Sequence, residues 1–229
     1  MILFVQNDDA VPAGRFASLL AVWQVPTRTW RPDRGESLPD LNTIRGVIIL
    51  GGYMGVHDGA RYPYLATVRT LMAELLARDI PQLGICLGGQ LLAAVLGGEV
   101  RSASHGERGC HTLQLTAAGQ SDPLFAGLPA TVPVFQWHND SFTLPPGALH
   151  LAMSADCPGQ ALRAGRAWGV QFHPEVTVEI IAAWARKCGA GPEVVAEFGA
   201  CEAALAEVAQ RLLGNFVAGI CALRPAAAP

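Results

Sequence analysis

The chain has 229 residues, of which 51% are hydrophobic, so it is long and apolar enough to bury one sizeable core. Its 16 basic and 19 acidic residues give a formal net charge of −3, which provides no basic surface for a nucleic-acid backbone. The single lysine, Lys187, follows no glycine-rich loop, and this excludes a Walker-type phosphate loop. We therefore expect one domain over residues 1–229 that does not bind nucleic acid.

The first half of the chain alternates apolar runs with helical patterns. Residues 2–5, 46–50 and 81–85 are continuous apolar runs, typical of strands that are covered on both faces. Residues 15–23 and 62–78 instead place their apolar side chains at helical spacing. Strands and helices alternate in this way when the strands pair in parallel, so this half predicts a doubly wound α/β sheet.

The second half of the chain is richer in short strands. Proline, glycine and aspartate separate four candidate strands, which lie around residues 111–116, 134–137, 150–154 and 167–172. This spacing predicts a β-rich region that is antiparallel in part. From Val176 onward the composition favours two helices, with a break at residues 189–192.

Neither a membrane span nor a disulfide framework is expected. Residues 80–98 carry no charge and are long enough to cross a bilayer, but they contain five glycines, which favour a strand, a turn and a helix. The six cysteines include no CxxC pair, and no charged and apolar leader follows Met1. These features predict reduced thiols in a cytoplasmic protein without a zinc site.

Cys86 stands in a glycine-flanked turn between a predicted strand and a predicted helix. The run from Gly84 to Gly88 has the pattern of a nucleophile elbow, in which small residues on either side allow a sharp turn. The start of the following helix offers free backbone N–H groups and the positive end of its dipole, which stabilise a thiolate and an oxyanion. On this segment alone, a buried structural cysteine remains an alternative.

Two further segments carry residues that suit the same chemistry. His173 ends a predicted strand, and Glu175 lies two residues later, where its carboxylate can hold one ring nitrogen of His173 and leave the other for a nucleophile. A His-x-Glu pair by itself is common on protein surfaces. The loop at residues 51–55 contains three glycines after another strand, so its backbone N–H groups can point into the crevice at the carboxyl end of the sheet.

The three motifs GGYMG, GICLGGQ and QFHPE, in this order, resemble the class I glutamine amidotransferases. The similarity runs from about Val47 to Glu175, and it is closest to stand-alone members of the kind related to the glutaminase of GMP synthase. It implies a flavodoxin-like, doubly wound and mostly parallel sheet, with a β-rich insertion in the second half and helices at the C-terminus.

The resemblance also implies roles for individual residues. Cys86 would be the nucleophile, His173 the general base and acid, and Glu175 the carboxylate that orients His173. The residues implied in substrate binding are Gly52 and Leu87, through an oxyanion hole of backbone N–H groups, and Gln90, which would hold the glutamine. The run His138, Asn139 and Asp140 matches the place where the family binds the α-amino and α-carboxylate groups of glutamine. Two positions depart from the family pattern: Tyr53 stands where many members have proline, and Asn139 where they have glycine or serine.

The activity implied by the resemblance is hydrolysis of the glutamine side-chain amide through a Cys86 thioester, without a cofactor or metal. No recognisable ATP-binding segment remains outside the three motifs, so the ammonia acceptor is missing from this chain. Either a separate synthetase subunit docks over the active site and uses the ammonia, or the enzyme works alone as a hydrolase or transferase. A γ-glutamyl peptidase or hydrolase could use the same three catalytic residues. A non-catalytic module that binds glutamine or a partner protein is a second alternative.

Overall fold

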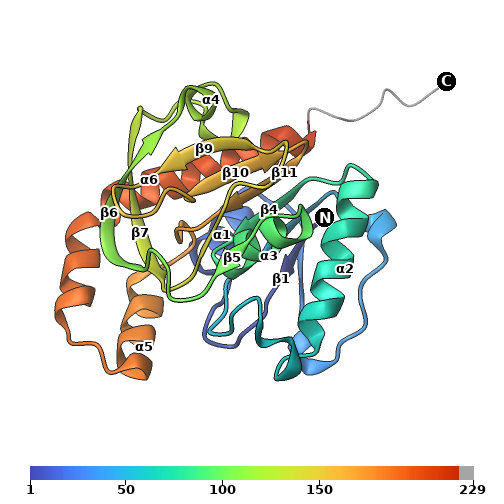
Figure 1. Ribbon diagram of the computed structural model, residues 1–229, viewed down its shortest axis with the longest axis horizontal. Coiled ribbons are helices and arrows are strands. Elements are labelled where there is room, and N and C mark those ends of the chain that lie inside the picture. Colours follow the sequence, from blue (N-terminus) through green and yellow to red (C-terminus); the bar gives the residue numbers. More distant parts are fainter. Residues whose placement is uncertain (222–229) are drawn as a thin grey trace.

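Nine strands form one continuous sheet in the computed structural model, which describes residues 1–221 (Figure 1). The strand order is β2-β1-β3-β4-β11-β10-β9-β6-β7. A separate antiparallel pair joins β5 (Val100–Arg101) to β8 (Ser141–Phe142). The strands of the large sheet are β1 (Ile2–Val5), β2 (Thr27–Trp30), β3 (Gly46–Ile49), β4 (Gln82–Ile85), β6 (Glu107–Leu115), β7 (Thr131–His138), β9 (Leu149–Met153), β10 (Ala161–Ala164) and β11 (Ala167–Val170).

One half of the sheet is parallel and has the flavodoxin-like strand order. Strands β2, β1, β3, β4 and β11 pair in parallel, which is the order 2-1-3-4-5 when they are counted along the chain. This confirms the predicted doubly wound fold. Strand β2 carried no apolar run in the sequence because it is an edge strand, in which only Trp30 is buried.

The other half of the sheet is antiparallel. Strands β10, β9, β6 and β7 extend the sheet beyond β11 through antiparallel pairs. The predicted β-rich region is therefore a continuation of the same sheet, and the last of its predicted strands, β11, crosses back to pair with β4 in the parallel half. This return brings the segment after β11 next to the turn after β4.

Helices cover both faces of the parallel half. In β1, Ile2 and Phe4 belong to a core with the first and last helices, whereas Leu3 and Val5 belong to a core with the second and third helices. All four side chains are buried, which is why the strand reads as a continuous apolar run. The helices are α1 (Gly14–Val22), α2 (Tyr64–Ala77), α3 (Leu87–Val95), the short α4 (Ala117–Gln120), α5 (Val178–Cys188) and α6 (Glu193–Cys221).

The two C-terminal helices form a third core against the antiparallel half. Trp184 of α5, Phe198 of α6 and Phe135 of β7 pack together there, and Gly189 ends α5 in the left-handed conformation, at the predicted break. The uncharged stretch at residues 80–98 folds as β4, a turn and α3, as predicted. In the part of the chain that the structure describes, no helix is both long enough and apolar enough to cross a bilayer.

Candidate active site

Cys86 occupies a strained turn at the carboxyl end of the sheet. Its φ of 51° and ψ of −108° lie in a region that non-glycine residues rarely adopt. Two backbone bonds hold the turn: Cys86 N donates to Val170 O at 2.8 Å, and Gln90 N donates to Cys86 O at 2.9 Å. The strain is therefore supported by β11 on one side and by the first turn of α3 on the other.

The glycines around Cys86 are required by close backbone contacts. A Cβ atom on Gly84 would lie 2.3 Å from Gly88 O, and one on Gly88 would lie 2.2 Å from Ile49 O. Similarly, a Cβ atom on Gly89 would lie 2.6 Å from Val170 O. No side chain fits at these distances, so the small residues let α3 start directly against β3 and β11.

His173 and Glu175 form a buried pair just after β11. His173 Nδ1 and Glu175 Oε1 are 2.8 Å apart, and both side chains are almost fully buried. The His173 ring also packs edge-on against Trp184, with 4.9 Å between the ring centroids. His173 Nε2 is buried and has no hydrogen-bond partner among residues 1–221. One ring nitrogen is thus held while the other stays available, which is the arrangement expected from the His-x-Glu spacing.

The charges of the site favour a protonated His173. Burial by itself lowers the pKa of His173, but the Glu175 carboxylate and the Cys86 sulfur outweigh it and raise this pKa to about 10. His173 and Cys86 face each other beside Gly51, where a Cβ atom would lie 3.2 Å from His173 Cε1 and 3.6 Å from Cys86 Cβ. An imidazolium in this place stabilises negative charge on the Cys86 sulfur.

A cavity of about 210 Å³ brings the predicted residues together. His173 and Cys86 both line it, and Glu175 lies behind His173. Gly52 and Leu87 are at its wall, and neither donates its backbone N–H to another atom within residues 1–221. All of the residues that the resemblance implied in substrate binding also line this cavity, namely Gly52, Leu87, Gln90, His138, Asn139 and Asp140.

Gln90 and His138 hold the protein segment that forms one wall of the cavity. Gln90 Nε2 donates to the Asp140 carbonyl oxygen at 3.1 Å and to Gln171 Oε1 at 3.2 Å. Both ring nitrogens of His138 also lie within hydrogen-bond distance of protein atoms. The Asp140 side chain accepts from Ala103 N at 3.0 Å. Direct contact of these side chains with a substrate stays a prediction.

Several cavity residues had no role predicted from the sequence. Arg108 of β6 is the cross-strand partner of Trp137 of β7, and its guanidinium lies over the Trp137 ring at 4.6 Å. Tyr53, one of the two departures from the family pattern, has Lys187 Nζ 3.7 Å from its ring centroid. Cys188, at the end of α5, also lines the cavity. These residues come from separate elements, and no local sequence signal joined them.

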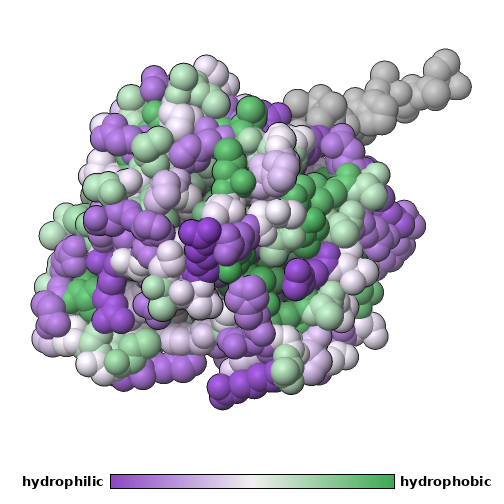
Figure 2. All heavy atoms as spheres, viewed as in Figure 1, coloured by the Kyte–Doolittle hydropathy of each residue, from purple (hydrophilic) through white to green (hydrophobic). Residues whose placement is uncertain are grey.

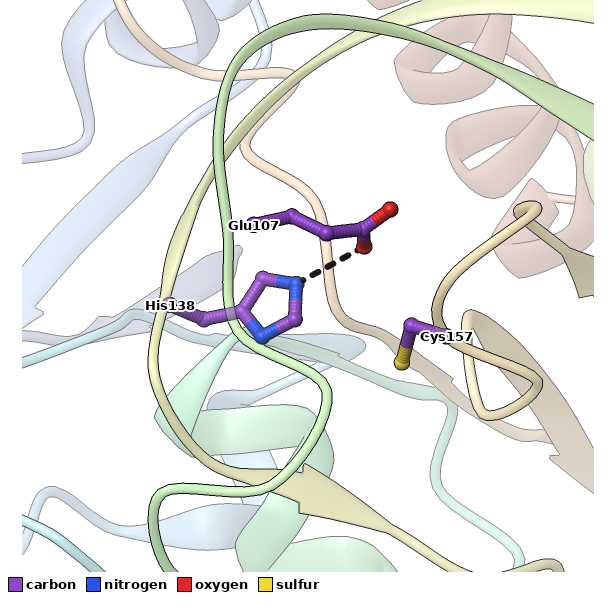
Figure 3. A group of neighbouring side chains, drawn as sticks. All are labelled: Glu107, His138 and Cys157. Atoms are coloured by element: carbon purple, nitrogen blue, oxygen red, sulfur yellow. Dashed lines mark hydrogen bonds and ion pairs between the residues drawn. The ribbon is translucent and has the colours of Figure 1, made fainter.

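Figure 3 shows a group of side chains, within residues 1–221, whose spacing would allow a metal ion. Glu107, His138 and Cys157 offer possible ligand atoms that all lie within 4.8 Å of one another. In the structure a direct hydrogen bond joins His138 Nε2 to Glu107 Oε2 at 3.1 Å, so these two atoms are already paired with each other. A metal ion would have to displace the proton between them.

Comparisons with known proteins point to the same family along most of the chain. A sequence model described as glutamine amidotransferase class-I matches residues 19–181. A glutamine-hydrolyzing GMP synthase of Thermomicrobium roseum is 39% identical over 133 residues, which are 58% of this chain and 23% of that protein. A glutamine-hydrolyzing GMP synthase subunit of Sulfolobus acidocaldarius is 42% identical over 101 residues, 43% of this chain and 52% of that protein. The crystal structure of a glutamine amidotransferase from Thermotoga maritima superposes with a TM-score of 0.86 at 30% identity, covering 94% of this chain and 97% of its own.

Proposed function

The chain belongs to the glutamine amidotransferase class-I family, and on that premise we propose that it hydrolyses the side-chain amide of glutamine through a thioester on Cys86. The observation that carries the proposal is the pairing of a strained-turn cysteine with a buried histidine whose other nitrogen is held by a carboxylate. A binding module would have no use for this arrangement.

The first half of the reaction forms the thioester. The Cys86 sulfur attacks the amide carbon, and the carbonyl oxygen becomes an oxyanion that the free N–H groups of Gly52 and Leu87 can stabilise by donating to it. The C–N bond then breaks while His173 transfers its proton to the departing nitrogen, so that ammonia leaves. Glu175 keeps the His173 ring in the orientation that this transfer needs.

The second half releases glutamate. His173, now neutral, takes a proton from a water molecule, and the resulting hydroxide attacks the thioester carbon. Collapse of this second tetrahedral intermediate breaks the C–S bond and returns the negative charge to the Cys86 sulfur. His173 is protonated again at that point, so both groups are back in their starting state.

We infer that the ammonia is used by a synthetase partner. The chain spans about a quarter of the length of the Thermomicrobium GMP synthase and about half of the Sulfolobus protein, and the names of these relatives support a synthetase acceptor. Hydrophilic and hydrophobic residues are interspersed on the face shown in Figure 2. Their distribution on this face does not indicate where a partner would dock.

Two general properties complete the proposal. We propose that residues 1–229 act as a single domain, because one sheet runs through both halves of the described chain. We also propose a cytoplasmic location, which the free thiols of all five described cysteines support.

The test is glutamate release by the purified chain. Wild type and Cys86→Ala are each incubated with glutamine, with γ-glutamyl dipeptides and with glutathione. Release from glutamine that the Cys86→Ala variant loses supports the proposal, whereas faster release from the γ-glutamyl peptides would favour a γ-glutamyl peptidase. If no substrate turns over, labelling of Cys86 by a diazoketone analogue of glutamine distinguishes a site that waits for its partner from a site that does not bind glutamine.

A further inference from the structure

His138 and Glu107 form a buried, hydrogen-bonded pair. His138 Nδ1 lies 2.9 Å from the Asp140 carbonyl oxygen, and His138 Nε2 lies 3.1 Å from Glu107 Oε2. Burial by itself raises the pKa of Glu107, but hydrogen bonds from His138 and Ser154 outweigh it and lower this pKa, which favours a carboxylate. Both ring nitrogens of His138 are therefore committed to protein atoms, one to the Asp140 carbonyl and one to the Glu107 carboxylate.

Other polar side chains surround the pair, of which Figure 3 draws Cys157. Gln160 Nε2 donates to the same Glu107 oxygen that His138 uses, and His111 Nδ1 lies 3.5 Å from the other carboxylate oxygen. Burial raises the pKa of the nearby Cys157 to about 11, so this thiol is neutral. Glu107 is therefore the anion of the cluster, with His138 Nε2 and Gln160 Nε2 against its Oε2, while its Oε1 makes no hydrogen bond among the described residues.

The pair is connected to the cavity through one carbonyl group. The Asp140 carbonyl oxygen accepts from His138 Nδ1 and also from Gln90 Nε2, at 2.9 Å and 3.1 Å. Gln90 lies one helical turn after Cys86, and its backbone N–H bonds to Cys86 O. The bonds from Glu107 through His138 thus fix residues 138–140 relative to the turn that carries the nucleophile.

We propose that Glu107 and His138 are positioning residues: the hydrogen bond between the Glu107 carboxylate and His138 holds residues 138–140 in the shape that recognises the α-amino and α-carboxylate groups of the substrate. This inference rests on the proposed function. Residues 138–140 form one wall of the cavity, whereas separate bonds hold Cys86 and His173, whose backbone N–H groups donate to Val170 O and to Phe135 O. Loss of the bond between Glu107 and His138 therefore weakens substrate binding and leaves the reactivity of Cys86 in place.

The variant Glu107→Gln tests this division, because it keeps the shape of the side chain and removes its charge. Two reagents then report on Cys86. Iodoacetamide needs only a reactive sulfur, whereas a diazoketone analogue of glutamine must first bind through its amino-acid group. Because a shift of about 1 Å can cost about 100-fold, we expect labelling by the analogue to slow by up to that factor. We expect alkylation by iodoacetamide to stay within about twofold of wild type, and the KM for glutamine to rise more than kcat falls.

Asp122→Asn is the matched control. Asp122 is also a buried carboxylate held by a side-chain donor, since Asp122 Oδ2 accepts from Arg163 at 3.1 Å, but it lies outside the cavity. The same chemical change there should leave both labelling rates unchanged. If Glu107→Gln does not fold, His138→Gln is measured with the same two reagents, because it removes the ring that joins Glu107 to the Asp140 carbonyl.

The outcomes separate this inference from the proposed function. If the analogue does not label wild type, both fail. If the analogue labels wild type and Glu107→Gln at the same rate, the proposed function stands and the positioning role is wrong. An equal loss of labelling by both reagents would also overturn the inference, because Glu107 would then support the whole site and not substrate recognition.

Discussion

At the scale of single residues, the site depends on what the ring nitrogens of two histidines contact. His173 keeps one ring nitrogen against Glu175 and the other toward Cys86, and its raised pKa of about 10 keeps it charged at neutral pH. His138 lies in the same cavity wall, but both of its ring nitrogens are used by the protein. The two residues therefore have different roles: His173 is the candidate acid and base, and His138 holds backbone in place.

The charge on His173 predicts how fast Cys86 is alkylated. The raised pKa of His173 keeps its ring protonated at neutral pH, and a positive charge beside a cysteine favours the attack of its sulfur. We therefore expect iodoacetamide to alkylate Cys86 about tenfold faster or more in wild type than in His173→Gln at about pH 7. Mass spectrometry of the peptide that contains Cys86 separates it from the other cysteines. Equal rates for the two proteins would contradict a charged His173.

At the scale of elements, the turn between β4 and α3 is the feature on which the site depends most. At three of its glycines, an added Cβ atom would collide with backbone atoms of neighbouring strands or of the turn itself. Because these positions have no side chain, the first turn of α3 can lie close to the sheet. The elbow pattern was visible in the sequence because it needs only local residues. The partner that holds the turn, Val170 O, could not be seen there, because it comes from a strand that is distant in the sequence.

We expect Gly88→Ala to lower the free energy of unfolding by about 3 kcal/mol, at the upper end of the usual cost of overpacking. The added methyl group would lie 2.2 Å from Ile49 O, and backbone cannot move as a side chain can. Gly199→Ala is the control, since this exposed position in α6 has no atom within 4 Å of the added group. That change should instead stabilise the protein by about 0.5–1 kcal/mol. Urea unfolding of both variants measures the two effects, and a similar result for both would show that the turn tolerates a side chain.

At the scale of the whole molecule, a single sheet joins a parallel half, which carries the nucleophile, to an antiparallel half, which carries the cavity wall (Figure 1). A buried carboxylate, Asp122, helps to hold the antiparallel half against the parallel half. It accepts from Trp168 Nε1 of β11 at 3.0 Å and from Arg163 of β10 at 3.1 Å. None of these three residues lines the cavity, so this contact contributes to stability.

Removing that carboxylate should therefore destabilise the fold without a specific effect on the site. We expect Asp122→Ala to cost about 3 kcal/mol, because it leaves the buried Trp168 N–H without its acceptor and Arg163 without its anion. Thermal or urea unfolding gives the loss. The rate of Cys86 alkylation, measured at a temperature where the variant is folded, should match wild type, and a slower rate would mean that the two halves are coupled through this contact.

The raised pKa of His173 also predicts how the stability of the whole protein changes with pH. The folded state holds this proton up to about pH 10, whereas an unfolded histidine releases it near 6.5. The stabilising contribution is therefore complete below about pH 6.5 and is lost as the pH rises toward 10, with a slope of at most about 1.4 kcal/mol per pH unit. Urea unfolding between about pH 6.5 and about 9.5 should show a steeper loss for wild type than for His173→Gln. Equal slopes would mean that folding does not change the affinity of His173 for its proton.

The sequence by itself determined strands β1, β3 and β4 of the parallel half, the elbow at Cys86 and the pairing of His173 with Glu175. Each of these depends on neighbours in the chain: continuous apolar runs, small residues around a turn, and two residues on the same side of an extended segment. Only the tertiary structure decided that β11 returns beside β4, that Arg108 and Tyr53 reach the cavity, and that His138 is held by Glu107. These contacts join residues from different elements, and their energy depends on burial and on distances that no local pattern contains.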